Sequence, residues 1–256
     1  MAPTIHLVRH AQGFHNLSIE NEQMQDPDLT PLGEEQCAAL RKEFPHHDKL
    51  TKLFASPMRR TVYTCLHAFG TDELKPIITI PVFQEVSANP CDIGSPVVKV
   101  QAEFEGIADY SNVEESWTDK GPDSEYEPTL EKLTARGLKA RKLLRDRVSG
   151  DEHIVVVSHG GFLHFLTDDW YGVPEGRATG WSNCEYRSYQ FVDPTGKDDD
   201  AALLETEESW QRRQGNTKSP TLTELRQVKS AAQKQMAPYL NLIMPNYMSE
   251  GSVTTG

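Results

Sequence analysis

The apolar run at residues 154–158, IVVVS, constrains the fold of this chain more than any other segment. A strand that stays apolar on both faces is typical of a parallel sheet with helices packed on either side. Other strand-like runs lie at residues 4–8, 52–55, 77–82 and 186–192. Helical patterns separate most of these runs, and strands that alternate with helices form α/β domains. The sequence therefore predicts a three-layer α/β/α fold with a mainly parallel central sheet.

Helix signals fill the gaps between these runs. A threonine or serine followed by proline occurs at residues 30–31 and 56–57. Such a pair joins a good N-cap to a residue that suits the first helical position, so each predicts a helix start. Apolar residues at helical spacing predict a further helix over 128–148. A helix-like run over 162–170 follows two glycines.

The C-terminal quarter of the chain differs in composition. Residues 193–214 are polar, charged and rich in turn formers, which predicts a surface linker. A capping-box pattern that starts at Thr221, followed by an apolar stripe, predicts a last helix as far as residue 236. We expect an α/β domain over residues 1–192. Residues 193–256 would form the linker and a C-terminal helical extension, packed on that domain or capping it as a lid.

The charge of the chain limits its partners. The chain has 26 Lys+Arg and 38 Asp+Glu, hence a formal net charge of −12. Nucleic acids and anionic membrane surfaces favour proteins with surplus cations, so we expect neither as a partner. A small phosphorylated molecule is still allowed, because a local basic pocket can lie inside an acidic shell.

Targeting signals and cysteines bear on the compartment. No run of 18 apolar residues predicts a membrane span, and the N-terminus lacks the pattern of a secretory signal. The four cysteines form no CxxC pair, which argues against zinc-ribbon and thioredoxin-like sites. A reducing, cytoplasmic setting is the simplest expectation. No feature of the sequence predicts an oligomeric state.

Three turns after predicted strands carry histidine or arginine. Arg9 and His10 follow the first strand, Arg59 follows the second, and His159 follows the run at 154–158. The carboxyl ends of parallel strands meet at one edge of a sheet, where ligands bind, so these side chains can converge. Arginine forks and helix N-termini suit an anion with several oxygens, most naturally phosphate.

Histidine adds a nucleophile to such an anion site, because its charge state is tunable near neutral pH. Taken singly, each residue has a plainer interpretation as a structural histidine, a solvated arginine or a tight glycine turn. Three such turns at strand ends favour a functional site. A metal site is the weaker alternative, because the nearby arginines repel a cation and the sequence has no HxH or HExxH spacing.

Four segments then resemble, in order, the motifs of the histidine phosphatase superfamily, which includes the cofactor-dependent phosphoglycerate mutases and their phosphatase relatives. The four segments, which lie between residues 4 and 192, are LVRHA with Asn16 six residues after the histidine, LTPLG at 29–33, SPMRRT at 56–61 and VVSHGG at 156–161. The third is similar to the family's SPLxRxxxT. Ala11 stands where the family usually has glycine.

The resemblance implies a role for each matching residue. His10 would be the nucleophile that becomes a phosphohistidine, and Arg9, Arg59 and His159 would line the phosphate pocket. Asn16 and the amide of Gly160 would add hydrogen bonds to phosphate. The family's proton donor follows the third strand in an L-x-E context, for which Phe83-Gln84-Glu85 is the best match, so Glu85 would protonate the leaving oxygen. Neither a metal nor another cofactor is implied.

The resemblance leaves three functions open. The leading one is a metal-independent phosphomonoester hydrolase acting on a small phosphorylated metabolite. The basic segment that follows the glutamate in glycolytic mutases is missing, because residues 86–95 read VSANPCDIGS. A phosphoglycerate-type phosphomutase is therefore the second hypothesis. A non-catalytic phospho-ligand binding protein is the third, and the full set of site residues argues against it.

Overall fold

The computed structural model describes residues 2–242, which form a seven-stranded sheet in the order β4-β3-β2-β5-β1-β6-β7. The first five strands in this order are parallel, and β6 and β7 are antiparallel at one edge. The strands are β1 (Thr4–Arg9), β2 (Leu50–Ala55), β3 (Ile77–Thr79), β4 (Ala108–Asp109), β5 (His153–Ser158), β6 (Tyr186–Phe191) and β7 (Leu203–Glu205). The predicted mainly parallel sheet is confirmed.

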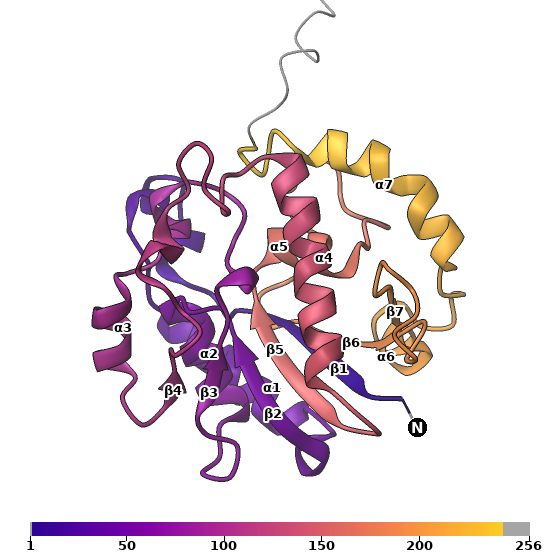
Figure 1. Cartoon of the computed structure of the whole chain (residues 1–256), viewed down its shortest axis with the longest axis horizontal. Coiled ribbons are helices and arrows are strands. Elements are labelled where there is room, and N and C mark those ends of the chain that lie inside the picture. The colour runs from indigo at the N-terminus through magenta and orange to yellow at the C-terminus, as the bar shows by residue number, and fades with distance from the viewer. Residues whose placement is uncertain (1, 243–256) are drawn as a thin grey trace, which may run out of the picture.

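Helices cover both faces of this sheet (Figure 1). They are α1 (Pro31–Glu43), α2 (Arg59–Phe69), α3 (Val97–Glu103), α4 (Leu130–Arg147), α5 (Gly160–Thr167), α6 (Glu207–Gln214) and α7 (Leu222–Met236). The side chains of β5 alternate between two cores. Ile154 and Val156 pack with residues of α4 and α5, whereas Val155 and Val157 pack with residues of α1 and α2. Burial on both faces explains why this strand is apolar throughout, and it confirms the three-layer α/β/α fold.

The helix starts follow the predicted signals with one shift. The Thr30 hydroxyl accepts a hydrogen bond from the Gly33 amide at 3.1 Å, so α1 begins where it is predicted. Helix α2 begins at Arg59 with Met58 as its N-cap, two residues after the Ser-Pro signal. At Thr221 the predicted capping box is present, and α7 ends at Met236 as expected.

The polar stretch at 193–214 is not the linker that its composition predicts, because it contains β7 and α6. Strand β7 extends the sheet beside β6, with Leu203 buried. The Thr206 hydroxyl caps α6, and Trp210 of that helix is buried. Arg213 forms an ion pair with Glu205 at 2.7 Å, so some of the charges that suggested a linker are paired with one another. Helix α3 and strand β4 were also not predicted from the sequence.

The topology brings three strand ends together. In the sheet, Arg9 of β1 is paired with Ser158 of β5, and Ala55 of β2 is paired with Val157. The turns that follow these strands therefore start side by side at the carboxyl edge. Within residues 2–242, no helix is long and apolar enough to cross a membrane.

Candidate active site

His10 follows β1 and is almost completely buried. Its Nδ1 lies 2.7 Å from the carbonyl oxygen of Ala11. A carbonyl can only accept, so Nδ1 carries the hydrogen, and Nε2 of the neutral ring keeps its lone pair. Burial, together with the charge of Arg60, holds the pKa of His10 well below its ordinary value. The ring is therefore neutral near pH 7 and can act as a nucleophile through Nε2.

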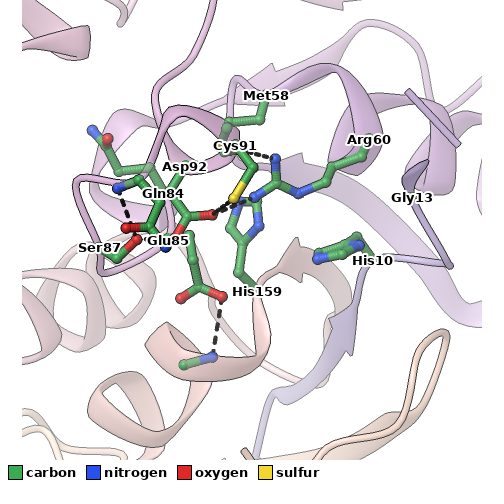
Figure 2. Close-up of polar contacts among 12 residues, drawn as sticks. His10, Gly13, Met58, Arg60, Gln84, Glu85, Ser87, Cys91, Asp92 and His159 are labelled. Carbon is green, nitrogen blue, oxygen red and sulfur yellow. Dashed lines mark hydrogen bonds and ion pairs between the residues drawn. The ribbon is translucent and has the colours of Figure 1, made fainter. Parts of the chain in front are cut away.

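His159 follows β5 and lies next to His10, with 5.2 Å between the ring centroids. Its Nε2 is 3.0 Å from the Ser56 hydroxyl, and its buried Nδ1 has no hydrogen-bond partner among the described residues. Burial and the charge of Arg60 lower the pKa of His159 well below its ordinary value. Figure 2 shows the two rings near Arg60 and Glu85.

The structure does not bring Arg59 to this group, which corrects the sequence prediction. The Arg59 guanidinium instead bonds to Glu103 at 2.8 Å and to Asp28 at 2.8 Å. The next residue, Arg60, is fully buried beside the histidines and holds the place expected of Arg59. Neighbouring residues on a helix point about 100° apart, so only one of the two can face the strand end.

Arg60 is held in place by two acceptors. Its Nη1 donates to the Cys91 carbonyl at 2.7 Å, and its Nη2 donates to the Asp92 carboxylate at 3.1 Å. Its Nε is buried and has no partner within residues 2–242. A signal for this residue was present in the sequence, because the arginine of SPLxRxxxT is fifth in the motif. Here the fifth residue is Arg60, and Thr64 follows at the threonine position.

Arg9, which is half-buried, supplies the second guanidinium. It donates through Nη1 to the Trp181 carbonyl, while its Nε is buried and has no partner in the described part of the chain. A Cβ atom on Gly160 would lie 3.1 Å from this Nε and 2.8 Å from Thr179. Glycine at this position therefore lets the start of α5 approach Arg9 closely, as a shared anion site requires.

Glu85 lies in the loop after β3, and its carboxyl group caps α5. It accepts from the amides of Gly161 at 3.2 Å and Phe162 at 2.9 Å. A Cβ on Gly161 would lie only 2.7 Å from the Glu85 carboxyl oxygen, so this contact depends on glycine. Burial raises the pKa of Glu85, and the charge of Asp92 adds to the shift. A raised pKa favours the protonated form, which is the form that can act as an acid.

Asn16 lies at the rim of the site and is ordered by two contacts. Its Oδ1 accepts from the Gly13 amide at 3.0 Å and faces Asn183 Nδ2 at 3.4 Å. Asn183 also donates to the His10 carbonyl at 3.1 Å. Because Oδ1 already accepts these contacts, Nδ2 of Asn16 is the end that can donate to an anion.

Some of these groups surround a cavity of about 150 Å³. Arg9, His10, Asn16, Glu85 and Gly160 line it. The lining also includes His15, Glu22, Tyr239 and Leu240. The last two follow α7, so the C-terminal extension does reach the site. No group of three or more His, Cys, Asp or Glu in the described residues is arranged to hold a metal ion.

His15 adds a fourth buried nitrogen atom that has no hydrogen-bond partner in the described part of the chain. Its ring centroid lies 5.3 Å from that of His10, and burial with the charge of Arg60 lowers the pKa of His15 to about 2. Its Nδ1 is buried and unpaired within residues 2–242, like the free nitrogens of Arg9, Arg60 and His159. Buried polar groups normally have partners, so these atoms indicate a site for a ligand rich in acceptor oxygens.

Comparison with known proteins agrees with the resemblance that the sequence motifs indicate. A family model described as the histidine phosphatase superfamily, branch 1, matches residues 5–203. The chain is 32% identical over 237 residues to a phosphoglycerate mutase-like protein of Arabidopsis thaliana, covering 74% of this chain and 84% of that protein.

Among solved structures, Bacillus stearothermophilus YhfR matches with a TM-score of 0.52 at 18% identity, covering 85% of this chain and 98% of that chain. Phosphoserine phosphatase from Entamoeba histolytica, solved with 3-phosphoglyceric acid, matches with a TM-score of 0.50 at 18% identity, covering 80% and 95%. At these identities the two solved structures establish the shared fold alone.

Proposed function

The chain belongs to the histidine phosphatase superfamily, and from this premise we propose that it is a metal-independent phosphomonoester hydrolase that works through a phosphohistidine. The observation that carries the proposal is the state of His10, a buried neutral ring with its Nε2 lone pair free and two guanidinium groups nearby, each with a buried Nε. A neutral imidazole surrounded by cations and unpaired donors suits attack on a phosphate ester.

In the first step, Nε2 of His10 attacks phosphorus and the bond from phosphorus to the ester oxygen breaks. Glu85, whose protonated form is favoured because burial raises its pKa, gives its proton to the leaving oxygen. In the second step, water attacks the phosphohistidine, the Glu85 carboxylate takes a proton from that water, and the phosphorus–nitrogen bond breaks. Phosphate leaves, and His10 returns to its neutral form.

Charge on the transferred group is stabilised by donors fixed before the reaction. Arg9 and Arg60 each have an unpaired buried Nε, and His159 has an unpaired Nδ1. Asn16 Nδ2 and the Gly160 amide, at the start of α5, complete the set of donors. Donors held in position lower the barrier, because they need no reorganisation as charge develops. Arg60 takes the part that we had expected of Arg59.

A small phosphorylated metabolite is the substrate in this proposal, because the cavity of about 150 Å³ can take a phosphoryl group and adjoins a second cavity, also lined by Arg9 and Thr179, that can take the leaving group. The mutase remains the second candidate, since a similar protein carries the name phosphoglycerate mutase-like. The loop at 86–95 favours the hydrolase, because it contains no lysine or arginine for a second anionic group. A cytoplasmic location stays a prediction.

Kinetics on p-nitrophenyl phosphate test the proposal. We expect turnover in the presence of a metal chelator, inhibition by vanadate, and a loss of at least about a thousandfold in His10→Ala. His47→Ala is the matched control, because His47 is a half-buried histidine outside the cavity, where its ring bonds to the Arg41 carbonyl and packs against Phe44 and Phe69. Activity of His10→Ala close to that of wild type would refute the mechanism. Transfer to an added acceptor with no release of free phosphate would support the mutase instead, and tight phosphate binding with no turnover would support a binding protein.

A further inference from the structure

Lys120 is a buried lysine at the back of the site, in the loop that follows a short 3-10 helix (Glu115–Thr118). Only 6% of its surface is exposed. Its amine donates to two backbone carbonyl oxygens, those of Glu85 at 2.8 Å and Ser87 at 2.6 Å. Lysine is rarely buried unless its charge is paired with a carboxylate, because desolvation of an ammonium group is costly. This placement calls for a specific reason.

The two carbonyls belong to residues with separate tasks in the site. Glu85 carries the carboxyl group that caps α5 and faces the cavity. The Ser87 hydroxyl donates to Asp92 at 2.6 Å, and Asp92 in turn accepts from Arg60. The Lys120 amine therefore fixes the backbone of two residues. One is Glu85, and the other is Ser87, which orients the Asp92 carboxylate that binds Arg60. Figure 2 shows Glu85, Ser87, Asp92 and Arg60 in this arrangement.

A second cation holds part of the same backbone but does not duplicate this role. Arg136 of α4 donates to the Gln84 carbonyl at 2.9 Å and to the Glu85 carbonyl at 3.3 Å. Its guanidinium also lies over the Phe162 ring at 4.3 Å. No bond joins Arg136 to Ser87 in the described chain, so Lys120 ties together the two ends of the turn at 85–87.

We propose that Lys120 is a positioning residue that keeps the Glu85 carboxyl group aligned with the leaving oxygen, by fixing the backbone of Glu85 and Ser87. The inference rests on the proposed role of Glu85 as the general acid. Without the amine, the Ser87 carbonyl loses its donor and the Glu85 carbonyl keeps only the longer contact with Arg136 at 3.3 Å, so the turn relaxes. The Glu85 side chain would then leave its place, and general acid catalysis depends on that placement.

The leaving group makes the test selective. An alkyl leaving group such as glycerol must be protonated as it departs, whereas p-nitrophenolate departs readily without a proton. Displacement of the acid should therefore lower kcat/KM far more for glycerol phosphate than for p-nitrophenyl phosphate. Loss of positive charge alone, or general loosening of the fold, would affect both esters alike.

The experiment compares Lys120→Met with wild type on these two esters. We expect kcat/KM to fall about 30-fold or more for glycerol phosphate and less than about threefold for p-nitrophenyl phosphate, since positioned acids contribute about 10²–10⁴-fold. Lys132→Met is the matched control, because Lys132 also donates to a carbonyl, that of Ser124, but lies away from the acid. It should change neither value. Equal losses on both esters in Lys120→Met, or no loss, would overturn the proposal.

Two further variants keep the outcome decisive. Lys120→Gln, which retains one donor, replaces Lys120→Met if the latter does not fold, and the same ratio is measured. Glu85→Gln should show the same dependence on the leaving group, and adding Lys120→Met to it should cost nothing more. If Glu85→Gln lowers both esters equally, the assigned role of Glu85 is wrong. If Glu85→Gln is selective and the Lys120 variants are not, only the role of Lys120 is wrong.

Discussion

Exchanging each of two adjacent arginines for lysine gives a sharp test of the site geometry. Arg60 has no exposed side-chain surface and divides its fork between the Cys91 carbonyl and the Asp92 carboxylate. Lysine at this position keeps the positive charge, so Asp92 is not left as an unpaired buried anion. A lysine amine cannot reproduce the planar fork, and thus cannot serve Asp92, Cys91 and a phosphate oxygen together.

The expected magnitude follows from the donor that is lost. Removing one fixed donor from a developing charge costs about 10²–10³-fold in rate, or about 2.7–4 kcal/mol. Since lysine retains the charge, we expect Arg60→Lys to lose about 30- to 100-fold in kcat/KM, which corresponds to about 2–2.7 kcal/mol. The assay is hydrolysis of p-nitrophenyl phosphate, with the thermal unfolding midpoint measured in parallel.

Arg59→Lys is the internal control. The Arg59 side chain is 23% exposed and bonds to Glu103 and Asp28, and a lysine can keep one of these pairs. Exposed or partly exposed pairs contribute about 1 kcal/mol or less, so kcat/KM should stay within about twofold. An Arg59→Lys loss equal to or greater than that of Arg60→Lys would refute the assignment of Arg60 to the phosphate site.

Two other substitutions test the placement of Glu85 and the protonation state of the buried His6. Gly161→Ala places a methyl group 2.7 Å from the Glu85 carboxyl oxygen and 2.9 Å from Leu240, so we expect kcat/KM for glycerol phosphate to fall at least about tenfold. Gly180→Ala is the control for a single added methyl, because that methyl would meet no atom closer than 3.6 Å, and an unchanged Gly161→Ala rate would contradict the close approach. Burial lowers the pKa of His6 to about 3. Below pH 6.5 the His6 side chain is therefore protonated in the unfolded chain but stays neutral in the folded chain, so the free energy of unfolding decreases as pH falls towards 3. Between pH 7.5 and pH 5, wild type should therefore lose about 2 kcal/mol more of its free energy of unfolding in urea than His6→Gln, at 1.36 kcal/mol per pH unit; equal losses would show that His6 is not held neutral.

The central layer of the fold could be predicted from the sequence because burial leaves a direct mark on composition. In β5, Val155 and Val157 face one core while Ile154 and Val156 face the other, so every position is apolar. Helix caps leave an equally local mark, as at Thr30 and Thr221. Strand β7 and helix α6 could not be predicted in this way. A segment whose charged residues pair with one another, as Glu205 and Arg213 do, has the same amino-acid composition as a segment whose charges are solvated.

The sequence motifs predicted which segments form the site, but not the position of every side chain within it. His10, His159, Arg9 and Glu85 do converge, because the topology forces the ends of β1 and β5 together. Which of two adjacent arginines faces the site depends on where α2 begins, and the Ser-Pro signal placed that start too early. Lys120 acts through tertiary contacts with a distant segment, for which a single sequence carries no periodic signal.

The state of His10 after mixing with substrate is the sharpest test for a phosphohistidine intermediate. Wild-type protein would be mixed with excess p-nitrophenyl phosphate, quenched with alkali within the first turnover and analysed by peptide mass spectrometry. Our account predicts one phosphoryl group on His10, stable in alkali and lost in acid, and none in His10→Ala. Hydrolysis by wild type with no phosphoryl group on His10, or with the group on another residue, would contradict it.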